Sequence, residues 1–317
     1  MKIVIPGGSG QVGSILAREF VARGHEVVIL SRGPSNGPGR QVPWDARHLG
    51  DWTSELEGAD AVINLAGRSV NCRYDKTNLS EMLSSRIDST RVVGQAIARS
   101  KRPPRLWLQM STATIYSHRF EAANDEATGQ IGGEEPGTPS YWRFSIEIAR
   151  AWERELEAAK TPHTRKIALR TAMVMSPDPG GILDRLSRMT RIGLGGPIAG
   201  GRQFVSWIHD QDLVRAVFFL IKNERVIGPV NLASPDPLPQ KEFMVLLRRA
   251  HRMPIGLPAS RALAELGAAI LRTDTELFLK SRRVIPGKLL EQGFGFRFGQ
   301  WESASQDLVK RRASRTP

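Results

Sequence analysis

The chain lacks the features that mark exported, membrane-spanning or cysteine-rich metal proteins. Its 317 residues include one cysteine, Cys72, which can form no intramolecular disulfide and leaves no thiolate cluster for a metal, so we expect a small core or loop residue there. No run of about 18 consecutive apolar residues exists, so no segment is expected to span a bilayer. Strand-like residues begin at Lys2, without the basic-then-apolar layout of a signal peptide, and we expect a cytoplasmic location.

Acidic residues are also in short supply. Asp and Glu number 32 against 45 Lys and Arg, which gives a formal net charge of +13. The basic residues are spread along the chain without the aromatic-interleaved module of a dedicated nucleic-acid binder, so no nucleic-acid partner is expected. The one dense cluster is the tail KRRASRTP, which we expect to be frayed and solvated. The excess positive charge would suit a phosphorylated or anionic ligand.

What the sequence does have is an alternation of strand-like and helix-like segments up to about residue 175. This pattern predicts βαβ units and an α/β fold with a parallel sheet covered on both faces. Helical spacing follows the first strand until Gly24, a natural C-cap, and further helices are expected near 79–100 and 140–160. The predicted strands are 3–5, 27–30, 61–66, 106–110 and 167–170.

After residue 175 glycine and proline crowd into MSPDPGG and GLGGPIAGG, and the elements become short and mixed. We therefore predict a Rossmann-type doubly wound parallel sheet, 1–175, to which segments about 203–235 return. A smaller α+β C-terminal substrate domain, 176–317, would follow, with a closing segment at about 255–305.

The stretch KIVIPGGSGQVG carries the first functional signal. Its glycines satisfy GxxGxxG and GxGxxG together, and they stand between a strand and an amphipathic helix. In that context glycines allow a tight turn, and they let backbone N–H groups and the helix N-terminus approach a pyrophosphate. The residues assigned to this loop are Gly7, Gly8, Gly10, Gln11, Val12 and Gly13.

The end of the second strand selects the cofactor. A dinucleotide fold that prefers NAD usually places Asp or Glu there to accept from the ribose 2′-OH. This chain has Ser31 and Arg32 instead. A guanidinium meets a 2′-phosphate well, so NADP(H) is favoured; the alternative is a solvated surface arginine.

These features resemble the short-chain dehydrogenase/reductase superfamily in its extended, epimerase-like branch. More specifically, the chain is similar to an atypical group of epimerase family proteins within the NAD-dependent epimerase/dehydratase superfamily, and the similarity covers essentially the whole chain. The motifs that carry it are GGSGQVG, ILSR and INLAG (63–67), then SSR (84–86), AWE (151–153), LRTAMVMSPDPGG (169–181), GLGGPIAGGRQFVSWIHDQDL (193–213), GPVNLASP (228–235) and RVIPGKLLEQGF (283–294).

The resemblance implies further cofactor contacts. Leu65, Ala66 and Gly67 would pass close to the cofactor ribose through backbone atoms. Glu81 and Arg86 match polar positions that reach toward the nucleotide, although each could equally be a solvated helix residue. Val174 would lie near the nicotinamide.

The catalytic signature of the superfamily is only partly present. Active members use a Ser or Thr after the fourth of these strands and a Tyr-x-x-x-Lys on the next helix, where the Lys lowers the tyrosine pKa. Thr112 matches the Ser/Thr position, with Ser111 beside it, and Tyr141 matches the tyrosine. Ser145 stands where the lysine is expected, so nothing evident depresses the phenol pKa from its usual value near 10.

Two other segments could carry function. Arg202 precedes the SWIH block at a position that lines the substrate side in the extended branch, so it is a candidate for an anionic group on the substrate. His209, Asp210 and Asp212 could be imagined as metal ligands, but residues two and three apart at a strand-to-helix junction do not converge well. Asp212 is better explained as an N-terminal helix residue stabilised by the helix dipole, and no metal is expected.

Two functional hypotheses remain. The first is an NADP(H)-dependent oxidoreductase or epimerase that acts on a small molecule such as a sugar, a nucleotide sugar or another carbonyl or hydroxyl compound. The second is a weak or inactive NADP(H)-binding sensor or scaffold, because of Ser145. The sequence is compatible with a monomer or a homodimer.

Overall fold

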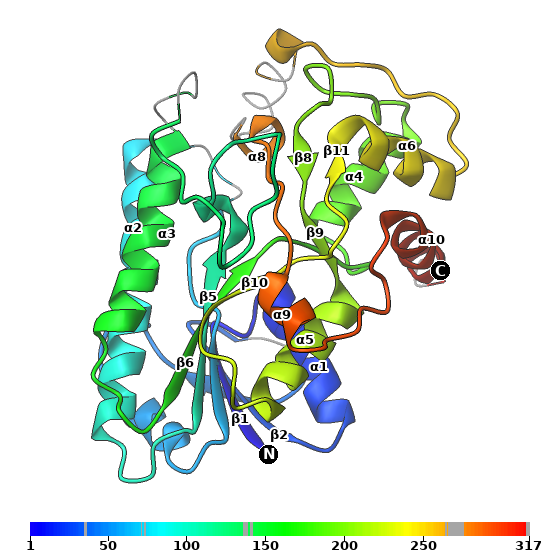
Figure 1. Cartoon of the computed structure of the whole chain (residues 1–317). Helices are drawn as coiled ribbons and strands as arrows, with labels where there is room; N and C mark the ends of the chain where they lie inside the picture. The colour runs from blue at the N-terminus through cyan, green and yellow to red at the C-terminus, as the bar shows by residue number, and fades with distance from the viewer. Residues whose placement is uncertain are drawn as a thin grey trace.

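The computed structural model describes residues 1–314 except 35–36, 71, 73, 136–138, 140–141, 264 and 266–275. Within this part, no helix is both long and apolar enough to cross a membrane. Strands and helices alternate through the first half of the chain (Figure 1). The strands are β1 (Lys2–Pro6), β2 (Glu26–Ser31), β3 (Arg40–Pro43), β4 (Ala61–Asn64), β5 (Leu106–Thr112), β6 (Arg165–Thr171), β7 (Met173–Met175), β8 (Phe204–Val205), β9 (Trp207–His209), β10 (Gly228–Leu232) and β11 (Leu238–Pro239).

The helices connect and cover these strands. Two of them, η1 (Asp51–Leu56) and η2 (Ala113–Ile115), are short 3-10 turns. The α-helices are α1 (Gln11–Ala22), α2 (Lys76–Arg99), α3 (Trp142–Ala158), α4 (Ile182–Arg191), α5 (Asp210–Lys222), α6 (Gln240–Ala250), α8 (Glu276–Leu279), α9 (Gly287–Glu291) and α10 (Trp301–Ala313).

Seven strands form one sheet in the order β10-β6-β5-β4-β1-β2-β3, and every pairing in it is parallel. The order reverses beside β1, so β1 and β4 end at the switch point where parallel α/β sheets open a crevice for ligands. The five predicted strands are confirmed as β1, β2, β4, β5 and β6, and Gly24 ends α1 with a φ of +75°. The predicted doubly wound α/β sheet is therefore present.

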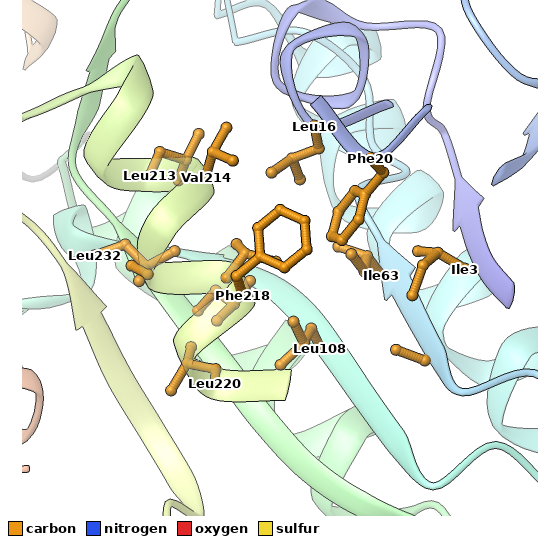
Figure 2. Close-up of a cluster of buried hydrophobic side chains, with 14 of the residues drawn as sticks. Ile3, Leu16, Phe20, Ile63, Leu108, Leu213, Val214, Phe218, Leu220 and Leu232 are labelled. Carbon is orange, nitrogen blue, oxygen red and sulfur yellow. The ribbon is translucent and has the colours of Figure 1, made fainter. Parts of the chain in front are cut away.

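The alternation of β1 explains how both faces of the sheet are buried. Ile3 and Ile5 face a core shared with α1 and α5, whereas Val4 faces a second core shared with α2 and α3. Figure 2 shows the first core, where Phe20 of α1 and Phe218 of α5 lie with ring centroids 4.4 Å apart. Two helices thus cover each face of the sheet, and the carboxyl ends of its parallel strands lie together at one end of it.

An additional C-terminal region packs beyond that end of the sheet. Its core joins α4, α6 and α10 to the short strands β7 and β9. Trp301 is fully buried there and stacks on Phe243, with ring centroids 4.0 Å apart. β10 returns from this half of the chain to form the outer strand of the main sheet.

The basic tail differs from our expectation. Instead of fraying, residues up to 313 form α10, and its cations find buried acidic partners. Arg311 donates to both carboxylate oxygens of Asp210, at 2.8 and 2.9 Å, and Arg312 pairs with Asp184. Charge counting missed these pairs because Asp184 and Asp210 lie more than a hundred positions away in sequence. Residues 315–317 lie outside the described part.

Candidate functional site

The glycines of the turn after β1 differ in what a side chain at each position would meet. Gly7 adopts a φ of +74°, and a Cβ on it would lie 2.6 Å from the Cα of Ala66. A Cβ on Gly13 would lie 2.3 Å from the carbonyl oxygen of Gly8, so this glycine lets α1 pack onto the turn. At Gly10 the nearest atom to a Cβ is 3.8 Å away, which leaves open space above the turn. A Cβ on Gly8 would lie 2.9 Å from the carbonyl oxygen of Ile5, so three glycines serve the fold and Gly10 leaves room for a ligand.

The start of α1 has the chemistry of an anion site. Gly10 is the N-cap and offers no side-chain hydrogen bond, and no acidic residue stands in the first turn. The side-chain nitrogen of Gln11 is buried and has no hydrogen-bond partner in the described residues. Free N–H groups at a helix N-terminus attract phosphate. An open cradle with an unpaired donor beside it fits the pyrophosphate of a dinucleotide. Val12, one position further along this first turn, is partly buried.

Ser31 and Arg32 at the end of β2 have different surroundings. The Ser31 hydroxyl is buried and donates to the carbonyl oxygen of Gly33 at 2.7 Å, so it shapes the turn after the strand. Arg32 is exposed, and within the described part of the chain it has no hydrogen bond or ion pair. Of the two, Arg32 is the group that a 2′-phosphate can reach without breaking a contact within the protein.

The loop after β4 lies against the glycine turn. Leu65 donates its N–H to the carbonyl of Pro6, and Ala66 donates to the side-chain oxygen of Asn64 at 3.1 Å. Asn64 is itself buried and bonded to Gln109, so two neighbouring strands fix the path of this loop. The backbone of the loop therefore borders the cradle at the switch point.

Arg86 and Glu81 have partners within the protein. Arg86 is buried beneath Gly67, where it donates to the carbonyls of Met82 and Arg68, and burial lowers its pKa to about 10. Glu81 is exposed and pairs with Arg68. In this arrangement Arg86 supports the loop from below rather than extending into the crevice, because two backbone carbonyls satisfy its guanidinium.

At the end of β5 the two adjacent hydroxyls point to opposite faces of the sheet. Ser111 is buried and donates to Glu153 of α3 at 2.6 Å. Thr112 is partly exposed, and its hydroxyl oxygen accepts from the N–H of Thr114, which caps η2. Alternation along a strand makes this division unavoidable. Thr112 therefore lies on the face of the sheet that α1 covers, and Ser111 on the face that α3 covers.

Glu153 belongs to a buried polar network that ties α3 to the sheet. Arg170 binds it through two hydrogen bonds of 2.9 and 2.7 Å and also donates to the hydroxyl of Tyr116. Burial alone would lower the pKa of Arg170, but the hydrogen bonds and charge of Glu153 outweigh it and raise that pKa above its ordinary value. Tyr116 in turn donates to Asn231 of β10. The network is fully paired, so it serves the scaffold rather than proton transfer.

Tyr141 lies outside the described residues, immediately before α3. Ser145 is described: its hydroxyl donates to the carboxylate of Glu276, a buried residue of α8. The position of the expected lysine therefore faces an acidic side chain from the C-terminal segment.

The remaining sequence candidates come from the second half of the chain. Val174 is buried in β7 and pairs with Ile208. Arg202 is exposed, with its guanidinium carbon 5.9 Å from the ring centroid of Phe120. The described residues contain no group of three or more His, Cys, Asp or Glu arranged to hold a metal. His209 instead caps α5 and contacts Asp307, and Asp212 accepts from the backbone N–H of Arg297.

Comparison with known proteins places this geometry in a family. A model of the NAD dependent epimerase/dehydratase family matches residues 3–233. The chain belongs to the NAD-dependent epimerase/dehydratase family. A second model, a domain of unknown function (DUF1731), matches residues 265–308.

Similar members of the family extend over almost the whole chain. The human epimerase family protein SDR39U1 is 31% identical over 316 residues, covering 98% of this chain and 100% of the human one. The YfhF protein of Bacillus subtilis is 29% identical and covers 98% of each chain. A crystal structure of human SDR39U1 (isoform 2) with NADPH superposes with a TM-score of 0.84 at 28% identity, covering 98% of this chain and 99% of that one.

Two residues near the end of β5 were not predicted from the sequence, and both come from the C-terminal segment. Arg282 donates to the hydroxyl of Thr114 at 3.1 Å and to the carbonyl of Glu276, which fastens α8 against η2 at the end of β5. Lys280, on the same segment, donates to the carbonyl of Thr114 at 2.8 Å. A cluster of Lys and Arg near the closing motif was the available signal, but no local spacing connects it with β5.

Proposed function

We propose that this protein is an NADP(H)-dependent oxidoreductase or epimerase acting on a small carbonyl or hydroxyl compound. The observation that carries the proposal is the open cradle at Gly10, where an uncapped helix N-terminus and the unpaired donor of Gln11 meet. Membership of the family and the NADPH in the human relative's crystal structure support the choice of cofactor class.

Different residues of the chain would bind different parts of the cofactor. The open turn at Gly10 would hold the pyrophosphate, with Gly7 and Gly13 giving the turn its shape, and Arg32 would pair with the 2′-phosphate through a charge-assisted hydrogen bond. The backbone at 65–67 would border the ribose. When bound, the nicotinamide supplies or accepts a hydride.

Thr112 is the better candidate of the two hydroxyls for orienting substrate. It is partly exposed at the end of β5, whereas the hydroxyl of Ser111 is already used by Glu153. Arg202 is exposed near Phe120 and would meet an anionic group of the substrate. Tyr141 stays a candidate for the acid or base.

A second candidate function is an NADP(H)-binding sensor or scaffold without turnover. The specific observation in its favour is Ser145, which stands where the lysine is expected and donates to Glu276. Both candidates require the cofactor, and they differ only in whether the cofactor reacts.

The test of the proposal has two stages. Purified protein is first titrated with NADPH and with NADH, and then incubated with NADPH and a panel of sugars, nucleotide sugars and carbonyl compounds while nicotinamide absorbance is followed. Oxidation of NADPH by any panel member excludes the pure binding module. Tight NADPH binding without oxidation by any member would favour the sensor, and absence of binding would refute both.

A further inference from the structure

Lys280 is the buried charged group that the site described so far does not explain. Its side chain is 1% exposed, yet it carries an ammonium, a group that costs several kcal/mol to bury unless it is paired. It donates to the carbonyl of Thr114 at 2.8 Å and lies 3.7 Å from a carboxylate oxygen of Glu276. The ammonium therefore has two polar partners within the protein, Thr114 and Glu276.

The partners of Lys280 connect it with the position of the missing lysine. Glu276, which pairs with Lys280, also accepts the hydrogen bond of Ser145 on α3. Thr114, whose carbonyl accepts from Lys280, lies two residues after Thr112. The ammonium is therefore placed between the end of β5 and the first turn of α3, the two elements from which the superfamily's catalytic side chains come.

A pocket borders this place. It has a volume of about 110 Å³ and lies at the start of α3, where Lys280 forms part of its wall. The other lining residues come from the loop before α3 and from the helix itself: Gly133, Glu134, Glu135, Pro139, Trp142, Arg143 and Ile146. A volume of this size accepts a carbonyl group with a few attached atoms.

Burial brings the titration of Lys280 near the physiological range. Burial lowers its pKa to about 8, although Glu276 on its own segment and Glu135 on the loop before α3 both raise it, and Arg282 lowers it further. His118, from the segment after η2, is the other titratable group that interacts with the ammonium, and its own pKa is lowered, chiefly by burial. An acid that titrates near the working pH is the most effective proton donor.

We propose that Lys280 is itself the proton donor and acceptor of this site, the role that a tyrosine fills in the superfamily, and that it supplies from the C-terminal segment the ammonium that α3 lacks at Ser145. The inference rests on the proposed function. In the reductive direction the Lys280 ammonium gives one proton to the carbonyl oxygen as a hydride from a reduced nicotinamide reaches the carbonyl carbon. The C=O bond becomes an alcohol, the nicotinamide is oxidised, and the neutral amine recovers a proton from water. Glu276 and Thr114 hold the amine in place.

The test compares Lys280→Met with Lys288→Met. Lys288 lies on the same C-terminal segment but donates to the carbonyl of Ile227, away from the pocket. We expect Lys280→Met to lower kcat for NADPH oxidation, measured with the most reactive carbonyl compound of the panel, by about a hundredfold or more while the Kd for NADPH changes less than twofold. Lys288→Met should change neither quantity by more than twofold.

Two further measurements keep the test independent of folding and of turnover. The 13Cε signals of labelled lysines, followed by NMR against pH and assigned with the Lys280→Met spectrum, should show one lysine titrating near 8. Adding Ser145→Lys to Lys280→Met restores an ammonium at the start of α3, and it should recover at least tenfold of the lost rate.

The outcomes separate the two claims. A Lys280 signal that titrates above pH 10, or a Lys280→Met variant that binds NADPH and keeps at least half of the wild-type kcat, would overturn the role of Lys280. Failure of the proposed function is recognised differently, because wild-type protein would then oxidise no NADPH with any panel member, and the assignment of Lys280 as a catalytic residue would fall with it.

Discussion

Gly10 offers a substitution that should remove cofactor binding without touching the fold. Its backbone, with a φ of −78° and a ψ of 175°, is one that alanine adopts readily, and a Cβ would meet no atom closer than 3.8 Å. We therefore expect Gly10→Ala to leave the free energy of unfolding unchanged or to raise it by about 0.5 kcal/mol, since alanine restricts the unfolded chain. The added methyl group would stand where the pyrophosphate must approach.

The expected loss of affinity follows from how closely the pyrophosphate must approach the backbone at Gly10. Backbone N–H groups bind a phosphate only at direct hydrogen-bond distance, and pushing the phosphate away by a methyl radius removes at least one charge-assisted bond. At about 1.5–3 kcal/mol for such a bond, the Kd for NADPH should rise by about tenfold to a hundredfold. Calorimetric titration with NADPH gives this value, and urea unfolding gives the stability.

Gly13→Ala is the matched control, because it should lower the stability of the protein, whereas Gly10→Ala should lower its affinity for NADPH. A Cβ there would lie 2.3 Å from the carbonyl oxygen of Gly8, so this variant should lose about 1–3 kcal/mol of stability through overpacking before any ligand is added. The reasoning is refuted if Gly10→Ala binds NADPH like the wild type, or if Gly10→Ala is the less stable of the two variants.

Two further predictions concern stability. Glu153→Gln leaves Arg170 buried without its counter-charge and should cost about 3 kcal/mol in urea unfolding, while adding Arg170→Met should cost less than the sum of the single losses; additive losses would argue against a coupled pair. Burial lowers the pKa of His118, His209 and His251, so below about pH 6.5 the unfolded chain binds more protons than the folded one. The free energy of unfolding should therefore fall as the pH is lowered from 7 to 5. A free energy that stays constant or rises as the pH is lowered would contradict the lowered pKa values of these histidines.

The inner strands could be predicted because each is a short buried run between turn residues. Residues 27–30 and 61–64, for example, are buried almost without interruption, as parallel strands covered on both faces must be. The edge strand β3, Arg40–Pro43, has no such run and is half exposed, and its strand conformation comes from pairing with β2. Local pattern cannot supply that information.

The same limit applies to the site. The glycine turn and Arg32 were found from sequence because their signals are local. The buried roles of Ser111 and Arg86 were not, because Glu153 and the carbonyl of Arg68 reach them through the fold. Lys280 meets Thr114 across 166 positions of sequence, and only the docking of the C-terminal segment brings the two together.

The most direct test of the account is the affinity for NADPH relative to NADH, measured for wild-type protein and for Arg32→Ala. Arg225→Ala, which removes another exposed arginine in the turn after α5, is the control. We predict that the wild type binds NADPH about tenfold to a hundredfold more tightly than NADH, and that Arg32→Ala alone abolishes the difference. Equal affinity of the wild type for both nucleotides, or a preference for NADPH that survives in Arg32→Ala, would contradict the account.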